Sequence, residues 1–207
     1  AFAALQELRR QDRLRIRVVK YLRREVLDSV LEAGMRTGFG DDYLRFGGLK
    51  LFADGALGAR TAAMFDPYEG EPENTGILTL DPQQLRELAR RAVRGGVALA
   101  IHAIGDRTNR LVLDVLEEVH PLAPELRHRI EHVQLITPED RRRLGEVGVV
   151  ASMQPIHAVH DIRMAEEYWG VRSRDAYAWR AIKDAGAVLA FGSDAPIEVF
   201  DPFAGLY

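Results

Sequence analysis

The feature that most constrains the fold is the stretch 97–135, in which two short apolar runs enclose an amphipathic segment. The first run, residues 97–101, leads into His102, and the second, residues 130–135, contains His132. Between them, apolar residues recur at the spacing of one helix face: Leu111, Val112, Val115, Leu116 and Val119. Strand, helix and strand in this order form a βαβ unit, which predicts a parallel sheet with a right-handed crossover.

Each histidine of this stretch falls near the carboxyl end of its predicted strand. In a (β/α)8 barrel that end of the sheet carries the active site. Two imidazoles side by side there would suit a metal ion. The other interpretation is that His102 and His132 are unrelated, one lining a core and one solvated. The stretch by itself favours neither interpretation.

Composition and charge narrow the class of protein. The chain has 207 residues, of which 47% are hydrophobic and 29% charged, which is ordinary for a globular protein with a sizeable core. A formal net charge of −3 gives no basic field for nucleic acid or for an anionic membrane. The absence of cysteine excludes disulfides, thiolate metal ligands and cysteine nucleophiles, and it fits a reducing, cytoplasmic compartment.

Targeting signals and membrane spans are not visible in the sequence. No apolar run reaches the ~20 residues that a membrane-spanning helix needs, and no signal peptide is recognisable. The chain begins without Met, inside a segment that already has a helical pattern. We therefore expect it to be a piece of a longer protein.

The rest of the chain continues the alternation of strands and helices. Strands are predicted at residues 14–22, 49–53, 97–101, 130–135, 149–153 and 187–191, and helices at 1–10, 25–35 and 174–185 and after two caps, Asp81 with Pro82 and Thr137 with Pro138. A loop from residue 54 to 76 has no clear structure, which is typical of a functional or disordered segment.

This alternation, without a linker, predicts one α/β domain over residues 1–207 with a parallel sheet. The sheet is either part of a (β/α)8 TIM-type barrel, here about six β/α units, or an open doubly wound sheet. The second fold often has a glycine-rich phosphate turn after its first strand. The sequence KYLRRE at that place has no such turn, which favours the barrel.

Polar side chains lie at or just after the ends of several predicted strands. Lys50, His102, His132 and Asp194 are placed in this way, and Gln154 and His157 follow another strand. Two histidines with carboxylate oxygens suit Zn²⁺, and also Mn²⁺ or Fe²⁺. Taken singly, a lysine at a strand end is more often a solvated surface residue than a ligand, and an aspartate there is as often a helix cap as a ligand. Together, on successive strands, these residues favour a metal site.

Five segments resemble the serial motifs of the amidohydrolase superfamily, and more narrowly its YtcJ-like branch, amidohydrolase family 3. They are LKLFADGALGARTAAMFDPYEG, LAIHAIGDRTNRLVLD, RIEHVQLITPED, MQPIHAVHD and FGSDAPIEVFDP, and the resemblance extends from about residue 14 to 202. It implies a (β/α)8 barrel with one or two divalent metals, for which zinc is the expected ion, and hydrolysis of non-peptide carbon–nitrogen bonds in small amide-type molecules.

The resemblance also implies roles for single residues. Lys50, His102, His132 and Asp194 match metal-ligand positions, and Asp194 matches the aspartate that serves as general base and then as acid to the leaving nitrogen. Lys50 matches a position that is a carbamylated lysine in some members of the superfamily. We expect Gln154, His157 and Asp54 to contact the substrate, with Asp161 also near the pocket.

Other polar and aromatic residues carry simpler expectations. Asp106, Arg129 and Glu131 either orient the ligand histidines or form ordinary salt bridges, and we favour salt bridges slightly. His120 and His128 are expected at the surface. We expect Trp169 and Trp179 to serve in packing.

The sequence departs from the family pattern in one respect. The family begins its barrel with a His-x-His pair that supplies two metal ligands, and this chain has no such pair. Two hypotheses follow. The chain is the catalytic portion of a metal-dependent amide hydrolase, or it is by itself a non-catalytic piece that binds metal weakly or associates with copies of itself as a homo-oligomer.

Overall fold

The computed structural model describes residues 2–206 and contains one parallel sheet. Its six strands are β1 (Val18–Arg23), β2 (Leu44–Phe52), β3 (Leu99–Ala103), β4 (Arg129–His132), β5 (Val150–Met153) and β6 (Val188–Phe191). The α-helices are α1 (Phe2–Arg10), α2 (Leu27–Glu32), α3 (Pro82–Arg94), α4 (Asp106–Val119), α5 (Pro138–Val147), α6 (Pro155–Trp169) and α7 (Trp179–Asp184). Three short 3-10 helices, η1 (Arg24–Val26), η2 (His120–Leu122) and η3 (Gly170–Asp175), complete the described elements.

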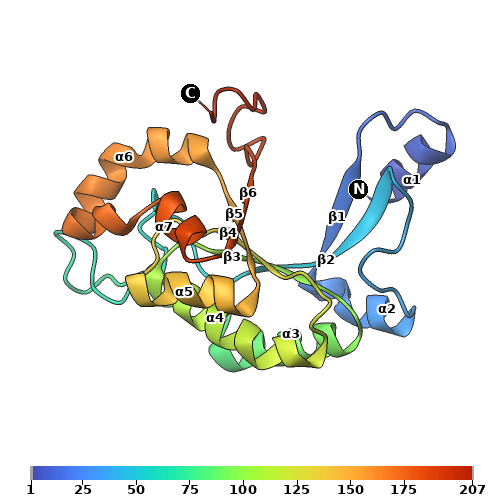
Figure 1. Cartoon of the computed structure of the whole chain (residues 1–207), viewed down its shortest axis with the longest axis horizontal. Helices are drawn as coiled ribbons and strands as arrows, with labels where there is room; N and C mark the ends of the chain where they lie inside the picture. The colour runs from blue at the N-terminus through green and yellow to red at the C-terminus, as the bar shows by residue number, and fades with distance from the viewer. Residues whose placement is uncertain (1, 207) are drawn as a thin grey trace.

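The strands lie in the sheet in their order along the chain, β1 to β6, and every neighbouring pair is parallel. Helices α3, α4 and α5 all lie below the sheet in the view of Figure 1. A doubly wound sheet would reverse its strand order and carry helices on both faces, so that alternative is wrong. The fold is an incomplete (β/α)8 barrel, as predicted, with β1 and β6 at its two open edges.

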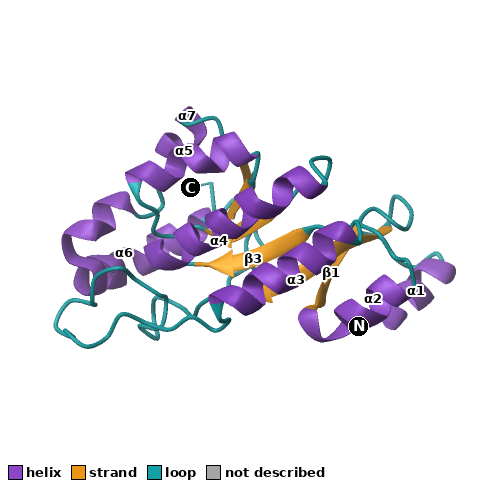
Figure 2. Cartoon of the chain, turned by 90° about the horizontal axis from the view of Figure 1, so that it is seen from below, coloured by secondary structure: helices purple, strands orange, loops and turns teal. Residues whose placement is uncertain are grey.

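The main core lies between the sheet and this layer of helices, which lies in front of the strands in Figure 2. Leu99 and Ile101 of β3 and Leu113 and Leu116 of α4 are fully buried there. Each such side chain contributes about 2 kcal/mol by leaving water. The strand period of two and the helix period of 3.6 therefore meet in one apolar layer, as the βαβ pattern predicted.

Two of the predicted helix starts are confirmed in detail. The Asp81 carboxylate accepts hydrogen bonds from the backbone N–H groups of Gln83 and Gln84, and Pro82 is the first residue of α3. The Thr137 hydroxyl accepts a bond from the N–H of Asp140 at the start of α5. These caps satisfy backbone donors that the helix itself leaves unpaired.

The segment 154–185 differs most from expectation. Helix α6 was not predicted, and the single helix expected over 174–185 is instead η3 followed by α7. Tyr177 separates these two elements with a φ of +49°, which a non-glycine residue rarely adopts. Helix α6 packs on a loop rather than on the sheet, so its apolar residues do not follow one simple stripe.

The loop that follows β2 is ordered and packs against α6. A second apolar cluster joins the two, with Leu57, Met64 and Tyr68 from the loop and Ala165 and Trp169 from α6. The loop and α6 follow the carboxyl ends of β2 and β5. They therefore form a cap, defined as residues 54–80 together with α6, on the end of the sheet where barrel enzymes place their chemistry.

Polar tethers reinforce this cap. The Arg172 guanidinium donates to the carbonyl oxygens of Asp66 (2.7 Å) and Pro67 (2.6 Å), and the N–H of Glu69 donates to the Tyr168 carbonyl. The cap is thus held by the Arg172 side chain of η3 and by a backbone hydrogen bond between its own two parts. Within residues 2–206, no helix combines the length and the apolar character that crossing a bilayer requires.

Candidate metal centre

Strand pairing brings two of the predicted ligands together. In the register of β3 and β4, His102 lies opposite Glu131 and Ala103 lies opposite His132. The centroids of the His102 and His132 rings are 4.7 Å apart, in an edge-on arrangement. Two histidines that are 30 positions apart in the sequence are therefore in direct contact at the carboxyl end of the sheet.

The backbone at His132 explains how its ring reaches this position. His132 has a φ of +78° and the next residue, Val133, has a φ of +45°. Such values are costly for a β-branched residue, and strain of this kind is concentrated at functional sites. A hydrogen bond from the Val133 N–H to the Ala103 carbonyl, 3.1 Å long, helps to hold the turn.

Hydrogen bonds fix which ring nitrogen of each histidine remains free. Nδ1 of His132 lies 2.8 Å from Oε1 of Gln154, and Nε2 of His102 lies 2.8 Å from the carbonyl oxygen of Gly55. Because both partners are acceptors, each of these nitrogens is the donor. The lone pairs are therefore on Nε2 of His132 and Nδ1 of His102, which is the state that binds a metal.

Burial keeps both imidazoles neutral. It lowers the pKa of His102 to about 4, with a further contribution from the neighbouring His132. It also lowers the pKa of His132 to about 4, against the opposing effect of the hydrogen bond to Gln154. At neutral pH neither ring carries a proton that would compete with a cation.

Lys50 lies beside this pair on β2. Its Nζ is 4.9 Å from the centroid of the Phe52 ring, and the Phe52 ring is in turn 5.3 Å from that of His102. Burial lowers the pKa of Lys50, and the charge of Glu131 opposes this. A lysine in such a place is less strongly held as an ammonium than one on the surface.

Asp194 follows β6 and is exposed, with a φ of +59°. Its charge contributes to the pKa of both His102 and Lys50, after burial as the main cause for each. The structure thus brings His102 and His132 into contact, with Lys50 beside them on β2, while Asp194 follows β6 and makes no direct contact with the two rings among those described. Among residues 2–206, however, no three His, Asp or Glu side chains form a group able to hold a metal ion.

The donor set therefore fits a divalent metal in part. Two neutral, adjacent imidazoles with free lone pairs are the ligands that Zn²⁺ and related ions prefer. A complete site needs at least one more ligand. The described residues therefore supply two candidate imidazole ligands and no third ligand beside them.

The three predicted substrate contacts have different surroundings. His157, on α6, is 8% exposed, and its ring stacks on that of His132 with 5.9 Å between centroids. Its Nε2 is buried and has no hydrogen-bond partner among the described residues. Gln154 instead orients His132, as described above. His157 is thus the one of the three with a free polar atom beside the paired imidazoles.

Asp54 is placed where it cannot contact a substrate directly. Its carboxylate is fully buried and accepts bonds from the N–H groups of Ala63 (3.0 Å), Ile104 (3.1 Å) and Gly105 (2.9 Å). Burial raises the pKa of Asp54 to about 6, and these backbone donors oppose the shift. Asp54 therefore ties the loop after β2 to the turn after β3.

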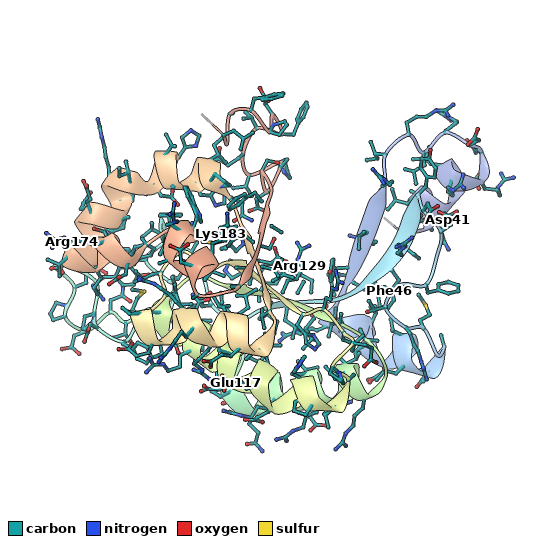
Figure 3. All side chains as sticks on the ribbon, in the orientation of Figure 1. Asp41, Phe46, Glu117, Arg129, Arg174 and Lys183 are labelled. Carbon is teal, nitrogen blue, oxygen red and sulfur yellow. The ribbon has the colours of Figure 1, made fainter. Side chains whose placement is uncertain are left out.

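The contacts of Asp106, Arg129 and Glu131 decide between the two roles that the sequence left open for them, which were orienting the histidines and forming salt bridges. Asp106 accepts from the N–H groups of Phe65 and Arg107, which fastens the same loop to α4. Arg129 and Glu131 form an ion pair with each other, and Figure 3 shows Arg129 on the side of the sheet opposite α3, α4 and α5. None of the three touches a histidine ring in these contacts, so the salt-bridge and tethering interpretation holds.

His128 was expected at the surface, and this prediction is wrong. Its side chain is 2% exposed at the amino end of β4, where Nδ1 accepts a hydrogen bond from the Leu99 N–H. Burial lowers the pKa of His128 to about 4. Trp169 is fully buried in the cap, and Trp179 packs against Phe191, as expected for packing residues.

Sequence reasoning missed three contributors to this region: Gly55, Gln134 and Tyr177. The carbonyl of Gly55 orients His102, and a backbone group leaves no signal in the residue type. Gln134 and Tyr177 form a polar cluster with Asp161, and only the position of Gln134 just after a strand end hinted at it.

Comparison with known proteins agrees with this geometry. A sequence profile of the amidohydrolase family matches residues 1–207, the whole chain. The chain belongs to the amidohydrolase family, whose members are hydrolases.

Individual relatives refine this assignment. The putative amidohydrolase YtcJ of Bacillus subtilis (strain 168) is 36% identical over 165 residues, covering 79% of this chain and 31% of that relative. The N-substituted formamide deformylase of Arthrobacter pascens is 25% identical over 162 residues, covering 77% of this chain and 30% of that relative. The crystal structure of an uncharacterised metal-dependent hydrolase from Pyrococcus furiosus superimposes with a TM-score of 0.90 at 36% identity. The match covers 100% of this chain and 42% of that protein. The chain spans well under half the length of each of these proteins.

Proposed function

We propose that the protein containing this chain is a metal-dependent hydrolase of carbon–nitrogen bonds in small, non-peptide amides. One observation carries the proposal: the contact between the His102 and His132 rings, which leaves both lone pairs free at the carboxyl end of the sheet. The name of the Pyrococcus relative, a metal-dependent hydrolase, supports it. So does that of the deformylase relative, which names N-substituted formamides.

Each candidate residue has a defined task in this proposal. His102 and His132 would hold the ion, with Lys50, as amine or carbamate, and Asp194 completing this chain's share. A bound divalent metal, for which we propose zinc in one or two copies, lowers the pKa of water and polarises a carbonyl group. Asp194 would accept a proton from the attacking water and give it to the leaving nitrogen. His157 would donate from its free Nε2 to the substrate.

A second candidate rests on the missing third ligand. Because no group of three ligands forms within residues 2–206, the 207-residue chain alone would bind metal poorly and be inactive. Its open sheet edges at β1 and β6 would also favour association of copies. We place the full protein in the cytoplasm, because a chain without cysteine fits a reducing compartment.

The test is metal analysis of the full-length protein followed by a screen of N-acyl and N-formyl amides. We expect one or two equivalents of zinc and release of amine from at least one amide, lost on chelation and restored by zinc. A protein that takes up no divalent ion, or that hydrolyses amides equally well after chelation, would contradict the proposal. The isolated 207-residue chain, measured in parallel, distinguishes the second candidate.

A further inference from the structure

A polar cluster centred on Asp161 lies about one helical turn from His157. Asp161 is the residue four positions after His157 on α6, so the two side chains project from the same helix face about 6 Å apart along the axis. Oδ2 of Asp161 accepts a hydrogen bond from the Tyr177 hydroxyl (2.6 Å) and another from Nε2 of Gln134 (3.1 Å). The carboxylate is thus fixed by groups from two other segments of the chain.

The backbone of Tyr177 is also held in place. Its N–H donates to the Gln134 carbonyl over 2.8 Å, and its φ of +49° is a strained value for a tyrosine. Gln134 lies two residues after His132, so the cluster is connected through the chain to the paired imidazoles. This arrangement positions a carboxylate beside the candidate metal centre more rigidly than a solvated aspartate would be.

Internal hydrogen bonds do not satisfy the cluster. Oε1 of Gln134 is buried, in a residue 4% exposed, and has no partner among the described residues. The two Asp161 bonds both involve Oδ2, and Oδ1, in a half-buried residue, takes part in neither of them. Nε2 of His157 is also buried and unpartnered. Buried polar atoms without partners are rare in folded proteins and call for an explanation.

The chemistry of these free atoms selects a ligand. Oε1 of Gln134 and Oδ1 of Asp161 are both acceptors, and the second carries negative charge. A primary ammonium group offers three N–H donors and a positive charge, whereas a carboxylate or phosphate offers none of these and would be repelled. We infer that Asp161 and Gln134 form a subsite for a primary ammonium group on the substrate, about one helical turn from the reacting amide.

This inference rests on the proposed function, since it identifies the substrate as an amide that also carries an amine. The spacing fits an amide nitrogen and an ammonium separated by a short alkyl chain. N-acetyl-1,4-diaminobutane has this form, and N-butylacetamide is the same molecule without the ammonium group. The pair therefore isolates the contribution of the charge.

The experiment is calorimetric titration of both amides into the zinc-loaded, full-length protein. We expect the wild type to bind the ammonium-bearing amide about tenfold or more tightly than N-butylacetamide, because a hydrogen bond to a charged group is strong when both partners are desolvated. Asp161→Asn should abolish this preference. Glu166→Gln, on the exposed face of the same helix, should retain it.

Equal affinity of the wild type for the two amides would overturn the inference, and this comparison decides it even if Asp161→Asn fails to fold. A preference that survives in folded Asp161→Asn would overturn it as well. Release of acetate separates this result from the proposed function. A binding preference without acetate release leaves the subsite standing and contradicts hydrolysis of this amide, while release from both amides at equal affinity contradicts the subsite and leaves the proposed function standing.

Discussion

A histidine lies at each end of β4, His128 immediately before the strand and His132 as its last residue, and the two have different surroundings. At the amino end, His128 is 2% exposed and uses Nδ1 to accept a bond from the Leu99 N–H. At the carboxyl end, His132 is similarly buried but contacts a second imidazole and leaves its Nε2 lone pair free. Both have a pKa lowered to about 4, by burial in each case.

The comparison teaches that burial and a shifted pKa do not by themselves identify a functional histidine. The two histidines differ in their backbone conformation and in the groups that their rings contact. His132 and Val133 have positive φ values, and the cap covers this end. In a barrel, the carboxyl end of the sheet serves the reaction and the amino end serves stability. His102 and His132 follow the first pattern, and His128 follows the second.

The largest effect is expected from substitution of Asp194, at the carboxyl end of the sheet. In the full-length enzyme, Asp194→Asn should lower kcat by ~10²–10⁴-fold, because an amide cannot accept a proton from water. Metal content should stay largely unchanged, since an amide oxygen can still approach the ion. A near-normal kcat would make His157 the candidate base and would weaken the assignment of roles at this end.

Substitution of Asp54 tests whether the carboxyl end of the sheet also contains groups with a purely structural role. Asp54→Ala should reduce the free energy of unfolding by about 3 kcal/mol or more, because three buried backbone N–H groups lose their acceptor. Denaturant unfolding measures the change, with Asp66→Ala, exposed in the same loop, as the control. Unchanged stability with a raised KM would restore Asp54 as a substrate contact.

His128 should make the protein less stable in acid. Its pKa is about 4 in the folded state and about 6.5 when unfolded, so the unfolded chain takes up the proton first. Its contribution is present above pH ~6.5 and is lost as the pH falls towards 4, by up to roughly 3 kcal/mol.

Unfolding free energies of wild type and His128→Asn, measured between pH 4 and 7, check this prediction. Asparagine offers an acceptor to the Leu99 N–H but does not titrate in this range. The variant should therefore show a flatter dependence of stability on pH. Parallel curves for the two proteins would mean that His128 is not buried as a neutral ring.

How much of this was predictable depends on the kind of interaction. The apolar periods around His102 and His132 were enough to predict parallel strands, and parallel strands bring their carboxyl ends to one edge. The burial of His128 was not predictable, because it depends on the Leu99 N–H from a neighbouring strand. Helix α6 was missed because its apolar residues serve the loop after β2, a contact that no periodicity within α6 encodes.

A smaller effect is expected for Gln154, which orients His132. Gln154→Leu should weaken metal binding by about 10–100-fold, because the ring loses the acceptor that fixes its tautomer. Competition with a chelator of known affinity measures the change. The matched variant at the other end of β4, His128→Asn, should bind metal as the wild type does.

The most direct test of the account is the zinc content of three single variants of the full-length protein. His102→Ala and His132→Ala should each lose most of the bound metal, because each removes an imidazole ligand outright. His128→Asn should retain the wild-type content, since its ring is at the opposite end of the same strand. Full zinc occupancy in His102→Ala and His132→Ala, or its loss in His128→Asn, would contradict the assignment of the metal centre to the carboxyl end of the sheet.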